Sequence, residues 1–208
     1  KHDEFNDILK TILIKGGIVT EDLKQLAKIK IKEYYLEKGY LDAEINILEF
    51  EDEEKEGTIR LVFDIDRKER IKIANIYFIG NNNVSTTKLK KKLANTKTQK
   101  ALFKKSKYII DDFEDDKVSM IEYYNKIGFR DAKIEYDSIW RRPEDGKLNM
   151  FLRINEGVKY YFNEISWKGN SIYEDDILSN VLGIKKGDVY NKELLEKRLQ
   201  FSMDGRDV

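Results

Sequence analysis

The strongest constraint on the fold of this 208-residue chain is an internal repeat with a fixed offset of 89 residues. Residues 34–45 recur as residues 123–134, and the same register continues to the Gly-Asn pairs at 80–81 and 169–170. A match kept in one register over 48 positions indicates related structural units. The period exceeds the ~20–50 residues of common solenoid repeats, so it predicts small independent modules.

The composition favours folded modules that neither bind nucleic acid nor contain a membrane-spanning helix. Charged residues make up 38% of the chain, but 40% of the residues are hydrophobic and 12% are aromatic, so disorder is not expected. The 39 basic and 39 acidic side chains cancel, whereas nucleic-acid binders are usually markedly basic. The longest run without a polar side chain is about four residues, far short of the ~20 that a membrane helix needs. The absence of cysteine excludes disulfides and leaves the compartment open.

One complete unit can be traced in the order strand, helix, helix, strand, strand. Residues 71–79 favour a strand, and their alternation slips between Ile73 and Ile76, which predicts a β-bulge. Ser85 is the expected N-cap of a short helix, and Ser171 has capping-box spacing to Glu174 in the next copy. A second helix is expected to end at Gly128.

The last two strands of the unit are expected to form a hairpin around residues 143–146. In its first strand, apolar residues alternate with charged ones. The apolar positions, expected to face the core, are Ala132, Ile134 and Tyr136, and the charged positions are Lys133, Glu135 and Asp137. In its second strand, the core positions are Leu148, Met150, Leu152 and Ile154.

The predicted fold class is therefore α+β, with β-α-α-β-β modules in which a three-stranded mixed sheet is covered by two helices. We expect residues 1–68 to be a module that lacks its first strand and residues 69–157 to be a complete module. Residues 158–208 are expected to be the truncated start of a third module, with a strand and helices. The chain is accordingly expected to be a piece of a longer protein.

The β-α-α-β-β order, the Tyr-x-x-x-Gly-Tyr/Phe-x-x-Ala signature at 35–43 and 124–132, and the strand-Gly-Asn turn resemble the POTRA (polypeptide-transport-associated) family. The tandem copies with short links, and the Gly-Ile-Lys-Lys-Gly-Asp stretch at 183–188, are similar to the periplasmic part of BamA-like outer-membrane protein assembly factors. The resemblance covers nearly the whole chain.

The resemblance implies a non-enzymatic scaffold in the periplasm, attached to the outer membrane through a membrane β-barrel that follows these modules. The implied partners are unfolded outer-membrane proteins, the lipoproteins of the assembly machinery and that C-terminal barrel. No cofactor is implied. Two alternatives remain open: the POTRA region of another transporter, in two-partner secretion or organelle import, and a passive structural spacer.

The mechanism implied by the resemblance is β-augmentation, in which a client strand pairs with an exposed sheet edge. If the last strand of each module is central, the second strand is an edge with available N–H and C=O groups. The candidate client-binding residues on these edge strands are Glu44, Asn46, Leu48, Lys133, Glu135, Asp137 and Ile139.

A basic stretch offers a second candidate contact. Nine lysines lie between Lys88 and Lys107 with no acidic residue among them. They could contact anionic lipid headgroups or an acidic partner, and the alternative is a solvated loop. The candidate lysines are Lys90, Lys91, Lys92, Lys104 and Lys105.

The remaining clusters favour structural roles. The acidic residues from Asp111 to Asp116 have no EF-hand spacing and are expected at a helix start, where the helix dipole favours negative charge. The tyrosine pairs at 34–35 and 123–124 are expected in or beside the core and not as platforms for nucleic-acid bases. His2 is the single histidine, and no serine has a nucleophile context, so we predict neither catalytic nor metal-binding residues.

Overall fold

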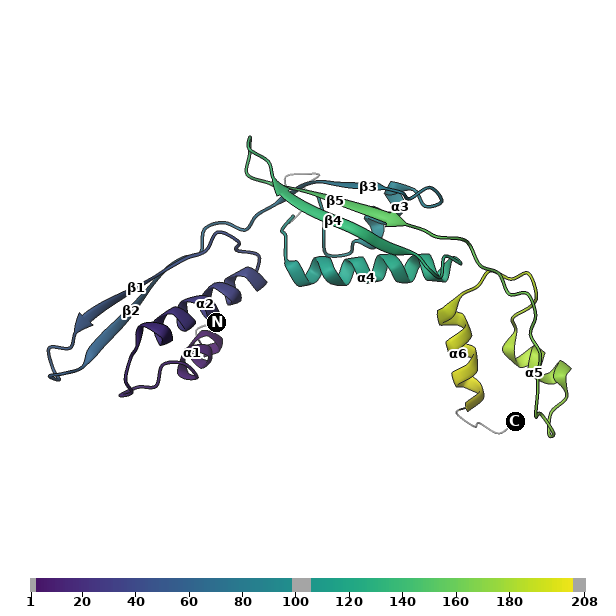
Figure 1. Ribbon diagram of the computed structural model, residues 1–208, viewed down its shortest axis with the longest axis horizontal. Coiled ribbons are helices and arrows are strands. Elements are labelled where there is room, and N and C mark those ends of the chain that lie inside the picture. Colours follow the sequence, from purple (N-terminus) through teal and green to yellow (C-terminus); the bar gives the residue numbers. More distant parts are fainter. Residues whose placement is uncertain (1–2, 99–105, 204–208) are drawn as a thin grey trace.

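The computed structural model describes residues 3–98 and 106–203, which form an arch of three segments (Figure 1). The strands lie along its convex side, and α2 and α4 lie beneath them. The elements are α1 (Asp3–Lys10), α2 (Glu21–Glu37), β1 (Glu44–Glu51), β2 (Ile59–Asp66), β3 (Ile73–Ile79), α3 (Thr86–Lys92), α4 (Ile110–Lys126), β4 (Lys133–Arg141), β5 (Leu148–Asn155), α5 (Asp175–Leu182) and α6 (Lys192–Met203). Within these described ranges, no helix combines the length and the apolar character needed to cross a membrane.

The middle segment contains a three-stranded sheet in the order β3-β5-β4. Strand β5 pairs in parallel with β3 and antiparallel with β4, so the last strand of the module is central. The predicted α+β class, with a three-stranded mixed sheet and helices, is confirmed.

The core of the middle segment lies between β5 and the two helices. The four alternate β5 side chains predicted as core are all buried, with at most 5% of their surface exposed: Leu148, Met150, Leu152 and Ile154. They belong to one cluster with helix residues that are equally buried: Leu89, Phe113, Met120 and Tyr124. Burying one such side chain contributes about 1.5–3 kcal/mol, so the face of β5 toward α4 dominates the stability of this module.

The strand pairing of the sheet is interrupted at two places. The predicted bulge is present, because the pairing of β3 with β5 shifts register between Ile73 and Asn75. A second shift in β4, between Ile134 and Tyr136, was not expected from the sequence. Glu135 is the extra residue at this second bulge.

The helix ends follow the expected chemistry with one exception. The Ser85 side chain accepts a hydrogen bond from the Lys88 N–H and caps α3. Gly39 and Gly128 follow α2 and α4 with φ angles of 84° and 100°, in the left-handed region that favours glycine. The capping box expected at Ser171 is wrong: Glu174, the counterpart of Ser85, is the N-cap of α5, and its side chain makes no capping hydrogen bond.

Asp116 has a role that differs from the one predicted. It was expected among the acids at a helix start, but it lies in the second turn of α4 and is 1% exposed. Its carboxylate accepts backbone N–H bonds from three successive residues after α3, namely Ala94, Asn95 and Thr96, at 2.6–3.2 Å. Asp116 therefore fastens the end of α3 to α4.

A second buried carboxylate holds the turn after β3. Glu156 accepts bonds from the Asn83 backbone and side chain and from the Tyr124 hydroxyl. Burial, together with this hydrogen bond to Glu156, raises the pKa of Tyr124 well above its ordinary value. Tyr124 is fully buried, which confirms its predicted place in the core.

The outer segments are less complete than the middle one. In the first, β1 and β2 form a two-stranded antiparallel sheet whose small core includes Ile31, Ala43 and Ile45. In the third, the expected opening strand is not formed: Tyr161 makes an isolated bridge with Val189, and residues 162–168 form no strand. The physical reason is the lack of a partner, since β3 pairs only with β5 and the third segment has no counterpart of β5 among the described residues. The exact division into modules stays a prediction.

We expect Asp116→Asn to destabilise the middle module by about 1–3 kcal/mol, because an amide nitrogen would face backbone donors that are buried or partly buried. The measurement is urea unfolding of the 208-residue chain, followed by tryptophan fluorescence. Asp115→Asn is the matched control, since Asp115 is exposed on the same helix turn. Equal midpoints for the two variants would contradict the role assigned to Asp116.

Candidate functional site

The candidate site is the outer edge of β4, together with the equivalent edge of β1. All seven predicted edge residues lie on these two strands, three on β1 and four on β4. Within the described residues, the backbone of neither strand has a hydrogen bond beyond those to its paired strand. Each outer edge therefore presents unpaired N–H and C=O groups to solvent.

The other edge of the middle sheet is partly covered by the chain itself. The Ser106 hydroxyl accepts a bond from the Ile73 N–H at 2.9 Å and donates one to the Ile73 carbonyl at 3.2 Å. The Tyr108 N–H also donates to the Ile71 carbonyl. These contacts occupy the start of β3, so β4 is the more open edge of this sheet.

The prediction of which β4 side chains face the core was wrong beyond Ile134, because of the bulge at Glu135. Tyr136 was expected in the core, but it is 53% exposed and lies opposite Arg153 on the open side of the sheet. Beyond the bulge, Asp137 and Ile139 pair with the buried residues Leu152 and Met150 and therefore face α4. Thus the four predicted β4 residues do not share one face, because the extra residue reverses the alternation.

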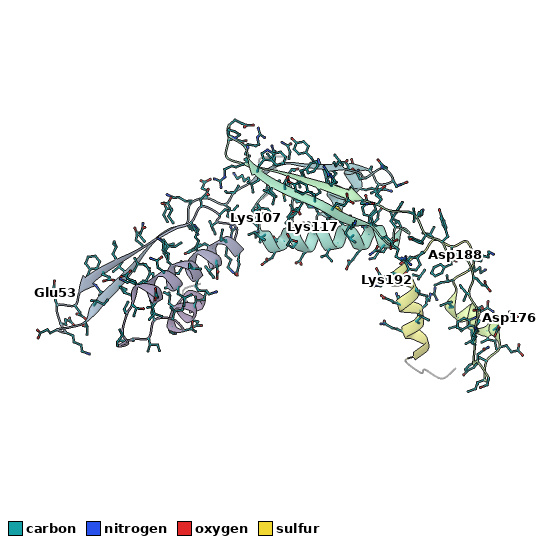
Figure 2. The ribbon with its side chains drawn as sticks, viewed as in Figure 1. Glu53, Lys107, Lys117, Asp176, Asp188 and Lys192 are labelled. Atoms are coloured by element: carbon teal, nitrogen blue, oxygen red, sulfur yellow. The ribbon has the colours of Figure 1, made fainter. Side chains whose placement is uncertain are left out.

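A groove runs between β4 and α4. Its volume is about 440 Å³, and its lining is Lys117, Val118, Ile121, Glu122, Asn125, Ile134 and Asp137. Lys117, labelled on α4 in Figure 2, forms ion pairs with Glu114 at 2.7 Å and with Asp137 at 3.4 Å. Val118 is 59% exposed, so this groove offers apolar surface directly beside the edge strand. This groove was not predicted from the sequence, although the helical spacing of Val118 and Ile121 indicates an apolar strip on α4.

The candidate lysines do not form a single surface in the described part of the chain. Lys90, Lys91 and Lys92 occupy consecutive positions at the end of α3 and so point in different directions. The Lys92 ammonium lies 4.3 Å from the centroid of the Tyr123 ring. Lys104 and Lys105 lie outside the described residues. Contact with anionic lipid stays a prediction.

An ion pair joins the two edge strands at the first junction between segments. Arg141, the last residue of β4, donates two hydrogen bonds to Asp42, at 2.8 and 2.9 Å. Asp42 precedes β1 by two residues, so the end of one edge strand lies near the start of the other. The bonds from Arg141 hold the pKa of Asp42 below its ordinary value.

No group of three or more His, Cys, Asp or Glu side chains suited to a metal ion occurs within residues 3–98 and 106–203. The interactions that the two edges and the groove offer are pairing through the backbone, apolar contact and ion pairs such as that of Lys117 with Asp137. These are the interactions of a binding surface.

Comparison with known proteins agrees with this architecture. The family model POTRA, described as a surface antigen variable number repeat, matches residues 2–68, 71–157 and 160–203. The outer membrane protein assembly factor BamA of Buchnera aphidicola (subsp. Acyrthosiphon pisum, strain APS) is 21% identical over 168 residues, covering 80% of this chain and 27% of that protein. The chain thus spans 27% of the length of this curated relative.

A solved POTRA structure shares the fold. POTRA domains 3–5 of Haemophilus influenzae BamA align with a TM-score of 0.50 at 17% identity, covering 88% of this chain and 70% of that one. The N-terminal domain of Omp85 from Thermosynechococcus elongatus aligns with a TM-score of 0.44 at 15% identity, covering 89% and 72%.

We expect Asp42→Asn to loosen the first junction, because a neutral amide cannot keep the paired bonds to Arg141. The orientation of the first sheet relative to the middle one, measured by residual dipolar couplings, should become more variable. Lowering the pH below the ordinary aspartate value of 3.8, toward the lowered pKa of Asp42, should have the same effect in the unsubstituted chain.

The control for this junction is Glu144→Gln, which removes an ion pair to Arg142 within a single hairpin. Its couplings should match those of the unsubstituted chain. Unchanged couplings in Asp42→Asn would show that other contacts fix the junction.

Proposed function

Because the chain belongs to the POTRA family, we propose that it acts as a non-enzymatic scaffold in the periplasm during the assembly of outer-membrane proteins. The name of its curated relative, an outer membrane protein assembly factor, supports this assignment. In this proposal the described modules hold unfolded client chains close to the outer membrane, and accessory lipoproteins and a membrane β-barrel of the same protein complete the machinery.

The observation that carries the proposal is the open edge of β4. An extended client segment can pair with this edge and extend the sheet from three strands to four. The client then satisfies its own backbone groups, which would otherwise drive aggregation with other unfolded chains. The edge of β1 offers the same groups in the first segment.

Pairing through the backbone suits a receptor for many clients. Main-chain hydrogen bonds carry affinity without depending on the client sequence, and side-chain contacts add preference. The groove beside β4 adds such contacts through Val118, Ile121 and Ile134. An edge strand with a groove can therefore hold clients that differ in sequence but share an extended apolar stretch.

The proposal predicts that proline in the edge strands weakens client binding without unfolding the modules. Glu49→Pro and Asp137→Pro each remove one backbone donor at an outer edge, because the register of each hairpin turns the N–H groups of these two residues away from the paired strand. Loss of one backbone bond should reduce affinity about twofold to tenfold. The measurement is fluorescence anisotropy with a labelled outer-membrane protein, unfolded in urea and diluted into buffer.

Glu53→Pro is the matched control, since Glu53 lies at the tip of the β1–β2 hairpin, away from both outer edges (Figure 2). Its affinity should equal that of the unsubstituted chain. Undiminished client binding by both edge variants would reject the proposed edge pairing and favour a passive spacer.

A further inference from the structure

The face of the middle sheet that is turned away from α4 carries aromatic side chains. Ring centroids of Tyr77 and Trp140 are 6.2 Å apart with nearly parallel planes, and those of Tyr136 and Phe151 are also 6.2 Å apart. Tyr77, Tyr136 and Trp140 are each 43–53% exposed. Aromatic side chains with this exposure are typical of contact surfaces.

The edge strand has a particular order of side-chain size on this open face. Tyr136, Ser138 and Trp140 follow one another at alternate positions, so a small residue lies between two large ones; we name these three the edge row. Phe151 is the register partner of Ser138 on the central strand. The Tyr136 ring meets Phe151 and the Trp140 ring stacks on Tyr77 of β3, so both rings lean over the central strand. The small Ser138 between them leaves room for a side chain of an added strand to reach these rings.

The first segment lacks this arrangement. Its register places Leu48 opposite Val62 and Phe50 opposite Arg60, which correspond to Ser138 with Phe151 and to Trp140 with Asn149. The bulky Leu48 occupies the place of the small Ser138, and Asn46 takes the place of Tyr136. The arrangement is thus particular to β4 and is not a general consequence of the repeat.

The open face of the sheet also carries a positive charge, on Arg153, which would favour a partner with a carboxylate. Arg153 lies in the same cross-strand row as Tyr136 and Ile79, and no carboxylate pairs with it among the described residues. A strand added to β4 lies about 9.6 Å from β5, twice the ~4.8 Å strand spacing. Arginine and glutamate side chains can together span this distance.

We propose that the edge row selects client segments that carry an aromatic side chain and, two residues later, a carboxylate. This inference rests on the proposed pairing of clients with β4. In an antiparallel added strand, the aromatic residue lies opposite Ser138, between the rings of Tyr136 and Trp140. The carboxylate then lies opposite Tyr136, on the side of Arg153. Pairing with β4 gives affinity, and the edge row gives preference among clients.

The test uses the 208-residue chain and the amidated peptide Thr-Val-Thr-Phe-Thr-Glu-Thr-Val-Thr, followed by NMR titration. Replacing the phenylalanine by alanine should weaken binding about twofold to tenfold, the range for an aromatic contact. Replacing the glutamate by glutamine should weaken binding at low salt and have little effect at high salt, since screening removes the exposed ion pair.

Variants of the chain locate the effect. Trp140→Thr and, separately, Tyr136→Thr should reduce the preference for phenylalanine, and Arg153→Gln should remove the preference for glutamate. Phe50→Thr is the control, because Phe50 is the counterpart of Trp140 in the first segment and should leave both preferences unchanged. Urea unfolding of each variant verifies that the module is folded, and the two independent aromatic variants guard against one failing to fold.

The outcomes separate this inference from the function on which it rests. Shifts along residues 133–141 with a preference that Trp140→Thr or Tyr136→Thr removes support the inference. Equal binding of the phenylalanine and alanine peptides at those residues overturns the inference and leaves edge pairing standing. Absence of shifts at β4 with every peptide overturns both.

Discussion

The position of β5 between β3 and β4 is the constraint on which the rest of the structure depends. Its buried face joins both helices to the sheet, and its backbone pairs with a parallel strand on one side and an antiparallel strand on the other. A central strand that is paired on both sides cannot pair with a strand of another chain. Unpaired backbone groups of this sheet therefore occur at its outer edges, β3 and β4. Contacts from Ser106 cover the start of the β3 edge.

The junctions between segments depend on the same short signature that ends each long helix. Gly39 adopts positive φ to end α2, and a Cβ at this position would lie 2.7 Å from the Tyr108 carbonyl of the next segment. Gly128 ends α4 in the same way, and a Cβ there would lie 2.7 Å from Val189. Glycine is thus required twice over, by the backbone conformation and by the close approach of the next segment. This explains how links of a few residues suffice between segments.

Sequence periodicity could predict the module because the buried side of β5 alternates without interruption. It could not predict the facing of β4, since the single extra residue at Glu135 reverses every side chain beyond it and leaves no signal in composition. It also could not predict the role of Asp116, because the sequence does not distinguish a carboxylate that binds the backbone amides of another segment from one that only faces the helix dipole. The third segment illustrates a further limit: residues 162–168 have a strand pattern, but a strand forms only where a partner is present.

The bulge that interrupts the sequence pattern also gives β4 different side chains on its two faces. Without the extra residue, the alternation of the strand would continue and Tyr136 would face α4 beside Ile134. With it, Asp137 reaches Lys117 at the groove, while Tyr136 and Trp140 reach the open face. A strand added at this edge alternates in the same way, so one set of its side chains meets a groove with charged and apolar lining and the other meets aromatic rings. One inserted residue therefore gives the two faces of a strand added here, as we propose for a client, different surfaces to contact.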